Sequence, residues 1–202
     1  MKLALIPVAV LLICSGCAFH GSHGSSTITL DGRSIRQDDG VFTVEGVELR
    51  HHRWVDVAAA RADETDMAFI TATGEITLEP SQDDGYALQV ELWSEIEGDG
   101  EVRLEGGRLV AHSDGGHELL INAVTGAVPD ALPLHGESGT GDVSLSGFSA
   151  GQALVIQAGT GAASIQGCRA GPIEVDAGTG RVTLQGVTGT TVRVSAGMGG
   201  TD

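Results

Sequence analysis

The sequence predicts an all-β fold, a single-stranded β-solenoid (β-helix) with coils of 19–20 residues. Three observations predict it. The 202 residues include 31 Gly and only 3% aromatic residues, which suits thin layers of aliphatic side chains. A Gly-x-Gly signature returns along the last third of the chain at spacings of 20, 19 and 19 residues, and a fixed period near twenty indicates stacked repeats. Between the signatures, apolar and polar residues alternate as they do in half-buried strands.

The signature is Gly-Thr-Gly three times, and Met198 takes the place of the threonine in the fourth copy. We expect it to form structural turns that close the second strand of each coil, at Gly139, Gly141, Gly159, Gly161, Gly178, Gly180, Gly197 and Gly199. A second set of glycines, Gly147, Gly167 and Gly186, is predicted to close the first strand, where a tight bend needs backbone angles that other residues resist.

The repeats align residue by residue, which predicts ladders of equivalent strands. In the first strand Val143 and Leu145 align with the pairs Ala163/Ile165 and Val182/Leu184. In the second strand the aligned apolar triplets are Leu154/Ile156/Ala158, Ile173/Val175/Ala177 and Val192/Val194/Ala196. Cys168 aligns with Phe148 and Val187, so we expect it to be a small buried apolar side chain and not a reactive thiol.

The predicted domain, residues 28–202, divides into three parts: an N-terminal cap (28–65), irregular coils (66–138) and the regular coils (139–202). In the irregular part, residues 119–126 align with 154–161, and 73–78 align with 140–145. Residues 58–62 offer one short helical turn. The last coil lacks a cap, and an unpaired strand is a template for edge pairing. The preferred interpretation is that the short strands and Gly199-Gly200 blunt this edge, and edge pairing of the C-terminal coil with a second copy or a partner stays open.

The N-terminal residues predict that the protein is located at the cell envelope. Lys2 precedes an apolar run from Leu3 to Ile13, which is too short to span a bilayer. The segment Cys14-Ser15-Gly16-Cys17 that follows resembles the lipobox of bacterial lipoprotein signal peptides, although Cys14 stands where that motif usually has Leu. The resemblance implies a signal peptide at 1–16 and lipidation of Cys17, with residues 17–27 as a flexible tether. Cys168 would then be the remaining thiol, so no internal disulfide is expected.

Charge argues against one class of partner. The formal net charge is −16, and residues 139–202 hold four acidic residues against three arginines, so nearly all the excess acid lies between Asp31 and Glu137. Nucleic acid is not expected as a partner, because phosphate binding needs a basic surface.

The repeated pattern, GTG-x-V/A-S/T-I/L-x-G followed by I/L-x-V-x-A-GTG, resembles the bacterial "putative adhesin" β-helix domain family. The similarity covers residues 119–202 well and 66–118 more weakly. The resemblance implies the fold and an exported or membrane-tethered location. The function of that family is unknown and no catalytic residues are attached to it, so none are implied here.

Motifs for chemistry are sparse, and we expect no cofactor and no metal. The only Lys is Lys2, so the Gly-rich turns cannot form a Walker loop. His112, Asp114, His117 and Glu118 could converge on zinc, but a polar surface turn is the preferred interpretation. Neighbouring charges on the second-strand face (Glu174, Asp176 and Arg193) could form a site, and a solvated charge pairing is preferred.

The sequence therefore predicts a non-enzymatic, lipid-anchored envelope protein, in the periplasm-facing outer membrane or at the cell surface. It would act as a binding or structural module in adhesion or envelope-stress sensing, held to the membrane by its lipid, with an envelope polymer or a protein as possible partner. Two alternatives stay open: a carbohydrate-active β-helix enzyme, and an accessory subunit that docks on a membrane complex. The ligand, the membrane, the coil handedness and the oligomeric state are not determined by the sequence.

Overall fold

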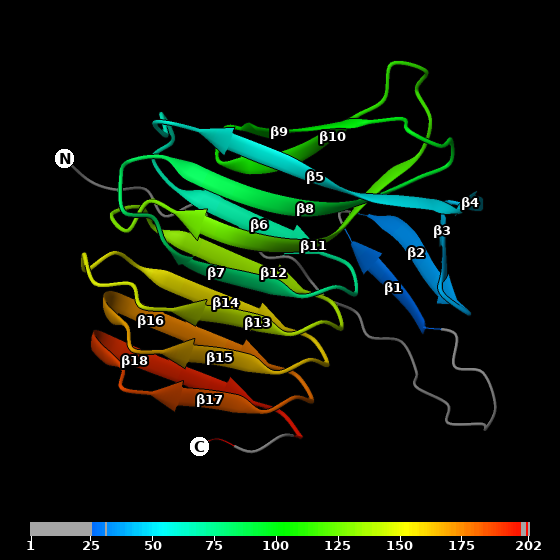
Figure 1. The fold of residues 1–202 in the computed structure, drawn as a ribbon. Coiled ribbons are helices and arrows are strands. Elements are labelled where there is room, and N and C mark those ends of the chain that lie inside the picture. Colours follow the sequence, from blue (N-terminus) through cyan, green and yellow to red (C-terminus); the bar gives the residue numbers. More distant parts are fainter. Residues whose placement is uncertain (1–25, 31, 199–200, 202) are drawn as a thin grey trace.

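The computed structural model describes residues 26–30, 32–198 and 201, and these form an all-β protein with three sheets. Figure 1 shows two large sheets facing one another, with a small sheet beside them. No helix long and apolar enough to cross a membrane occurs in this part of the chain. The predicted signal peptide and Cys17 lie outside the described residues.

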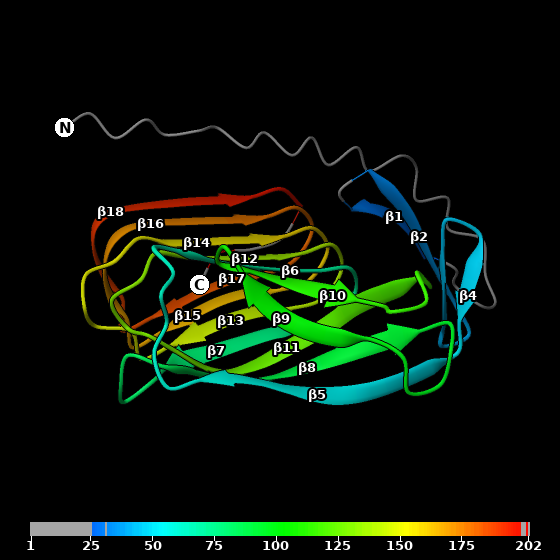
Figure 2. The same ribbon diagram turned by 90° about the horizontal axis from the view of Figure 1, so that it is seen from above.

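The small sheet, here called the β1 sheet, is an antiparallel meander of short strands. Its strands are β1 (Ser26–Leu30), β2 (Arg33–Asp38), β3 (Val41–Val44) and β4 (Val47–Leu49). Phe42 and Leu49 form its buried face and pack with Ala72, just after β6, and with Leu120 of β11. The β1 sheet therefore covers one side of the molecule, beyond the strand ends of the two large sheets (Figure 2).

One large sheet, here called the β6 sheet, has the order β18-β16-β14-β12-β6-β10-β9. Pairing is parallel from β18 to β10, and β10 pairs antiparallel with β9. Its strands are β6 (Met67–Thr71), β9 (Glu101–Glu105), β10 (Arg108–His112), β12 (Leu134–Ser138), β14 (Leu154–Ala158), β16 (Arg169–Ala177) and β18 (Thr188–Ala196).

The other large sheet, the β7 sheet, has the order β17-β15-β13-β7-β11-β8-β5. It is parallel from β17 to β11 and antiparallel from β11 to β5. Its strands are β5 (His51–Ala59), β7 (Ile76–Pro80), β8 (Tyr86–Ser94), β11 (Leu119–Val128), β13 (Val143–Ser146), β15 (Ala163–Gln166) and β17 (Val182–Gln185). The main core lies between the β6 and β7 sheets and includes Phe69, Leu78, Val90 and Ile156.

The single-stranded β-solenoid predicted from the sequence is wrong. The chain forms three sheets of four, seven and seven strands, and the pairing is mixed. The physical reason is that the 19–20-residue period covers only the last third of the chain. Upstream, long strands such as β5 and β8 pair antiparallel over nine residues, and antiparallel strands cannot continue a stack of identical parallel units.

Two further upstream predictions are also wrong. Residues 119–126 resemble 154–161 in sequence, but they belong to β11 in the β7 sheet, whereas 154–158 is β14 in the β6 sheet. The expected helical turn at 58–62 begins inside β5, where Ala58 pairs with Ala87. In contrast, the alignment of 73–78 with 140–145 is confirmed, because Ile76 pairs with Val143 and Leu78 with Leu145.

The residue alignment of the repeated strands is also confirmed. Val143, Ala163 and Val182 occupy one ladder, and Leu154, Ile173 and Val192 occupy another. Cys168 is buried, as predicted, with a relative exposure of 1%. The apolar positions of each repeat thus meet their counterparts in the next and build the lower part of the core.

Candidate binding site around the first half of β5

The four residues considered for zinc do not meet around one point. His112, at the end of β10, lies 3.0 Å from Glu105 through its Nε2 atom, while Glu118 pairs with Arg33 of the β1 sheet. His117 contacts a third partner, Asp99, described next. Within the described residues, no group of three or more His, Cys, Asp or Glu side chains could hold a metal ion.

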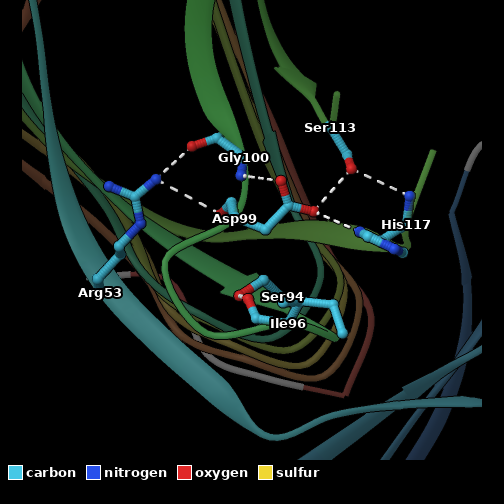
Figure 3. A network of polar contacts seen from close by, with 7 residues as sticks. All are labelled: Arg53, Ser94, Ile96, Asp99, Gly100, Ser113 and His117. Atoms are coloured by element: carbon cyan, nitrogen blue, oxygen red, sulfur yellow. Dashed lines mark hydrogen bonds and ion pairs between the residues drawn. The ribbon is translucent and has the colours of Figure 1, made fainter. Parts of the chain in front are cut away.

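Asp99 is the centre of a polar network between two loops (Figure 3). Its carboxylate accepts hydrogen bonds from the Gly100 amide (2.8 Å) and the Ser113 hydroxyl (2.6 Å), and it contacts His117 Nδ1 at 2.9 Å. The hydrogen bond from Ser113, followed by that from His117, lowers the pKa of the Asp99 carboxyl below its usual 3.8. The network holds the loop before β9 against the loop that precedes β11.

The network contains Ser, His and Asp, but not in the order that nucleophilic catalysis needs. In a catalytic triad the imidazole lies between the hydroxyl and the carboxylate, so that it can take the hydroxyl proton. Here Ser113 Oγ donates directly to Asp99 and accepts from the backbone N–H of His117 at 3.0 Å. The Ser113 hydroxyl is therefore hydrogen-bonded to the Asp99 carboxylate, and the arrangement holds the two loops together.

Arg53 ties β5 to the same loop. Its guanidinium donates to the carbonyl oxygens of Gly100 and Asp99 (Figure 3). Arg53 therefore links β5, the edge strand of the β7 sheet, to the chain that enters β9 at the edge of the β6 sheet. Nearby, the Ser94 hydroxyl at the end of β8 donates to the carbonyl of Ile96 at 2.8 Å.

Two depressions lie on either side of Arg53 and Gly98. One has a volume of about 560 Å³ and is lined by Arg53, Gly98, Asp99, Gly100, Glu101, Arg103, His112, Ser113 and Asp114. The other, about 430 Å³, is lined by Arg50, His51, His52, Arg53, Ser94, Glu97 and Gly98. Both linings carry charges of each sign. Arg103 pairs with Glu101 at 2.5 Å, and Arg50 pairs with the neighbouring Glu48. The surface thus offers many hydrogen-bond donors and acceptors with little net charge.

The outer face of β5 adds an aromatic surface beside these depressions. Trp54 is 52% exposed and pairs across the sheet with Glu91 of β8. The Glu91 carboxylate is held by the amide of Asn122 at 2.7 Å and lies 3.4 Å from His52 Nδ1. The His52 ring in turn stacks on Trp93, with centroids 4.6 Å apart. An exposed indole therefore stands next to a carboxylate, an amide and an imidazole that are fixed in place.

The other residues singled out in the sequence lie at the opposite end of the molecule. Two of the repeated glycines, Gly159 and Gly178, line a depression of about 410 Å³ together with Gln157, Asp176 and Met198. Gly199 is outside the described residues. Glu174 pairs across strands with Arg193, and Asp176 with Ser195. These charges lie side by side on the outer face of the β6 sheet.

Sequence reasoning missed Trp54, Glu91, Asn122 and Asp99 as site residues. One signal was available for Trp54. It shares one face of a strand with the polar residues His52 and Asp56, where a large apolar ring has no core to fill.

Comparison with known proteins gave distant structural similarities. No family model and no curated protein matches the chain. A cell adhesion protein from Clostridium sporogenes, described as putative, has a TM-score of 0.37 and 6% identity, covering 74% of this chain and 97% of its own. An adhesin from Bacteroides fragilis, also described as putative, has a TM-score of 0.25 and 15% identity, with coverage of 74% and 96%. A similarly described adhesin from Parabacteroides merdae has a TM-score of 0.24 and 10% identity, with coverage of 75% and 96%. The adhesin resemblance predicted from the sequence thus reappears only at a distance.

Proposed function

We propose that this chain is a non-enzymatic binding module of the bacterial cell envelope, anchored by a lipid on Cys17, and that it binds a saccharide polymer of the envelope through the outer face of β5 and the adjoining depressions. The observation that carries the proposal is the 52% exposed indole of Trp54, placed opposite the fixed Glu91 carboxylate.

A sugar ring suits this surface on chemical grounds. One face of the ring presents C–H groups, which pack on an indole, and its rim carries hydroxyls, which need donors and acceptors. Glu91 supplies acceptor oxygens beside Trp54, and the amide of Asn122 keeps the carboxylate oriented. Binding sites generally combine an apolar surface with a few fixed polar groups that set orientation.

A neutral polymer fits the charge of the site better than a strongly acidic one. The arginines that line the two depressions have carboxylate or carbonyl partners within the protein. The whole chain carries −16, which repels polyanions at long range. We therefore expect binding to persist at high salt.

The test measures binding of the full chain, in a mild non-ionic detergent, to isolated cell-wall polymer and to neutral oligosaccharides at two salt concentrations. Trp54→Ala is expected to weaken binding at least about tenfold, or about 1.4 kcal/mol. Met198→Ala, which changes an 87% exposed side chain at the other end, is the matched control and should bind like the wild type.

Equal binding by wild type and Trp54→Ala would contradict the proposed surface. Release of reducing ends during the incubation would instead identify a carbohydrate-active enzyme. The anchor is tested separately, because Cys17→Ser should move the protein out of the membrane fraction if that thiol carries the lipid.

A further inference from the structure

At one end of the two large sheets the outermost strands are β17 and β18 (Figure 1). Thr201 forms an isolated parallel bridge with Val182 of β17, whereas the inward positions of β18 are uncovered. Val192 is 44% exposed and Val194 is 39% exposed, whereas their partners one strand inward, Ile173 and Val175, are each 1% exposed. The difference arises because no further strand of the described chain lies beyond β18.

At the opposite end of the two large sheets, the edge strands β5 and β9 are linked to one another. There the edge strand β5 of the β7 sheet is bound by Arg53 to the carbonyls of Asp99 and Gly100, immediately before the edge strand β9 of the β6 sheet. The inward residues of these edge strands are covered, because Val57 of β5 and Val102 of β9 are each 7% exposed. Of the two ends of the large sheets, the β18 end is therefore the one that matches the uncovered β18 end of a second copy.

Charge permits two copies to meet at this end. Residues 177–198 contain Arg181 and Arg193 and no Asp or Glu, in a chain whose net charge is −16. Nearly all the acidic excess lies before Gly139, toward the far end of the sheets. The usual protection of an edge strand by many charges is thus weak on β18, whose nine residues include the single charge of Arg193.

We propose that two copies of this chain associate through β18, which pairs antiparallel with β18 of the second copy about a two-fold axis near Val194. This register places Val194 opposite Val194 of the other copy and Val192 opposite Ala196. It also places Arg193 opposite Ser195, so the two arginines are not directly opposed. A two-fold axis at Arg193 would oppose like charges, which destabilises a cross-strand pair. Such an isologous contact joins two sheets into one and covers the exposed valines.

The first experiment measures the mass of the full chain by sedimentation over a range of concentrations, in a mild detergent. Wild type is expected to form a dimer whose dissociation constant rises at least about tenfold in Val194→Lys. Val194 is 39% exposed in the single chain, so the lysine side chain can reach solvent and folding should be kept. Ile96→Lys is the matched control, because Ile96 is 46% exposed and lies away from β18.

The second measurement needs no variant. Amide hydrogen exchange of the wild type is compared at about 10 µM and about 1 mM, which brackets the affinity of a moderate dimer. Amides of β18 should become more protected at the higher concentration, and those of β5 should not change. A wild type that stays monomeric at the higher concentration would overturn the proposal. A dimer that Val194→Lys leaves intact, or one whose β18 amides gain no protection, would overturn it equally, because the contact would then lie elsewhere.

Discussion

Replacing Gly161 by Ala tests whether the close approach of successive turns holds the repeated strands in register. A Cβ at Gly161 would collide with the backbone carbonyl of Gly141. The same clash recurs between Gly141 and Gly74, and between Gly180 and Gly161. These are backbone contacts between successive stacked turns, so neither group can move aside as a flexible side chain can.

The magnitude follows from comparing two costs. Overpacking by a methyl group usually costs about 1–3 kcal/mol, and we expect the upper end because the obstacle is backbone. Ala also lowers the entropy of the unfolded chain, which offsets about 0.4–1 kcal/mol. The net loss for Gly161→Ala is therefore about 2 kcal/mol. With a urea m-value of about 2 kcal/mol per molar, the unfolding midpoint should fall by about 1 M.

Gly167→Ala is the matched control. Gly167 has a φ of +61°, and a Cβ added there would meet no atom within 4 Å, so its cost is purely conformational, about 1 kcal/mol. The assay is equilibrium unfolding in urea followed by circular dichroism. If Gly161→Ala were no more destabilising than Gly167→Ala, close packing of the turns would not be what makes glycine necessary there.

Two further predictions concern single side chains. Burial raises the pKa of the Cys168 thiol, so a thiol reagent should label Cys168 only after urea unfolds the protein, as read by mass spectrometry of its peptide; rapid labelling in the native state would contradict its position in the core. The pKa of Asp99 is lowered in the fold, mainly by Ser113, so its contribution to stability is present above pH 3.8 and is lost as pH falls through the lowered value. The urea midpoints of wild type and Asp99→Asn should therefore converge in acid, and a constant difference between them would show that the Asp99 charge is not involved.

The fold of the repeated strands could be predicted because the repeats specify both the buried face of each strand and the strand with which it pairs. When the same apolar positions recur at a constant spacing, each strand has one counterpart in the next unit, as Val143, Ala163 and Val182 show. The strands before residue 139 alternate apolar and polar residues, but their pattern does not recur at a fixed spacing. Alternation identifies the buried face of a strand, but it does not identify the neighbouring strand or its direction.

β11 illustrates what the sequence pattern could not specify. This strand pairs parallel with β7 on one side and antiparallel with β8 on the other. A register irregularity between Ile121 and Ala123 shifts its alternation partway along. Leu119 and Leu120, before that shift, are both buried because Leu119 lies in the main core and Leu120 packs against the β1 sheet. The similarity of 119–126 to 154–161 is therefore real in composition and misleading about the sheet.

The candidate site could not be predicted from the sequence for a related reason. The spacing of His112, Asp114 and His117 suggested that they converge, but their partners are determined by tertiary structure. His117 reaches Asp99, and His112 bonds across the β9–β10 hairpin to Glu105. Likewise, the distance in sequence from Trp54 to Glu91 and Asn122 left no local motif for the aromatic surface.

The division between regular and irregular halves also explains where recognition can arise. One outward row crosses the whole β7 sheet, and in the repeats it holds only Ser144, Ser164 and Thr183. On this face of the repeats, small hydroxyls at one strand spacing give little basis for discriminating ligands, because every step of the row presents the same group. The antiparallel half is free of that periodicity, so it can place a tryptophan, a carboxylate and two loops side by side. We infer that the repeated strands provide a rigid support, and that specific binding depends on the strands that break the repeat.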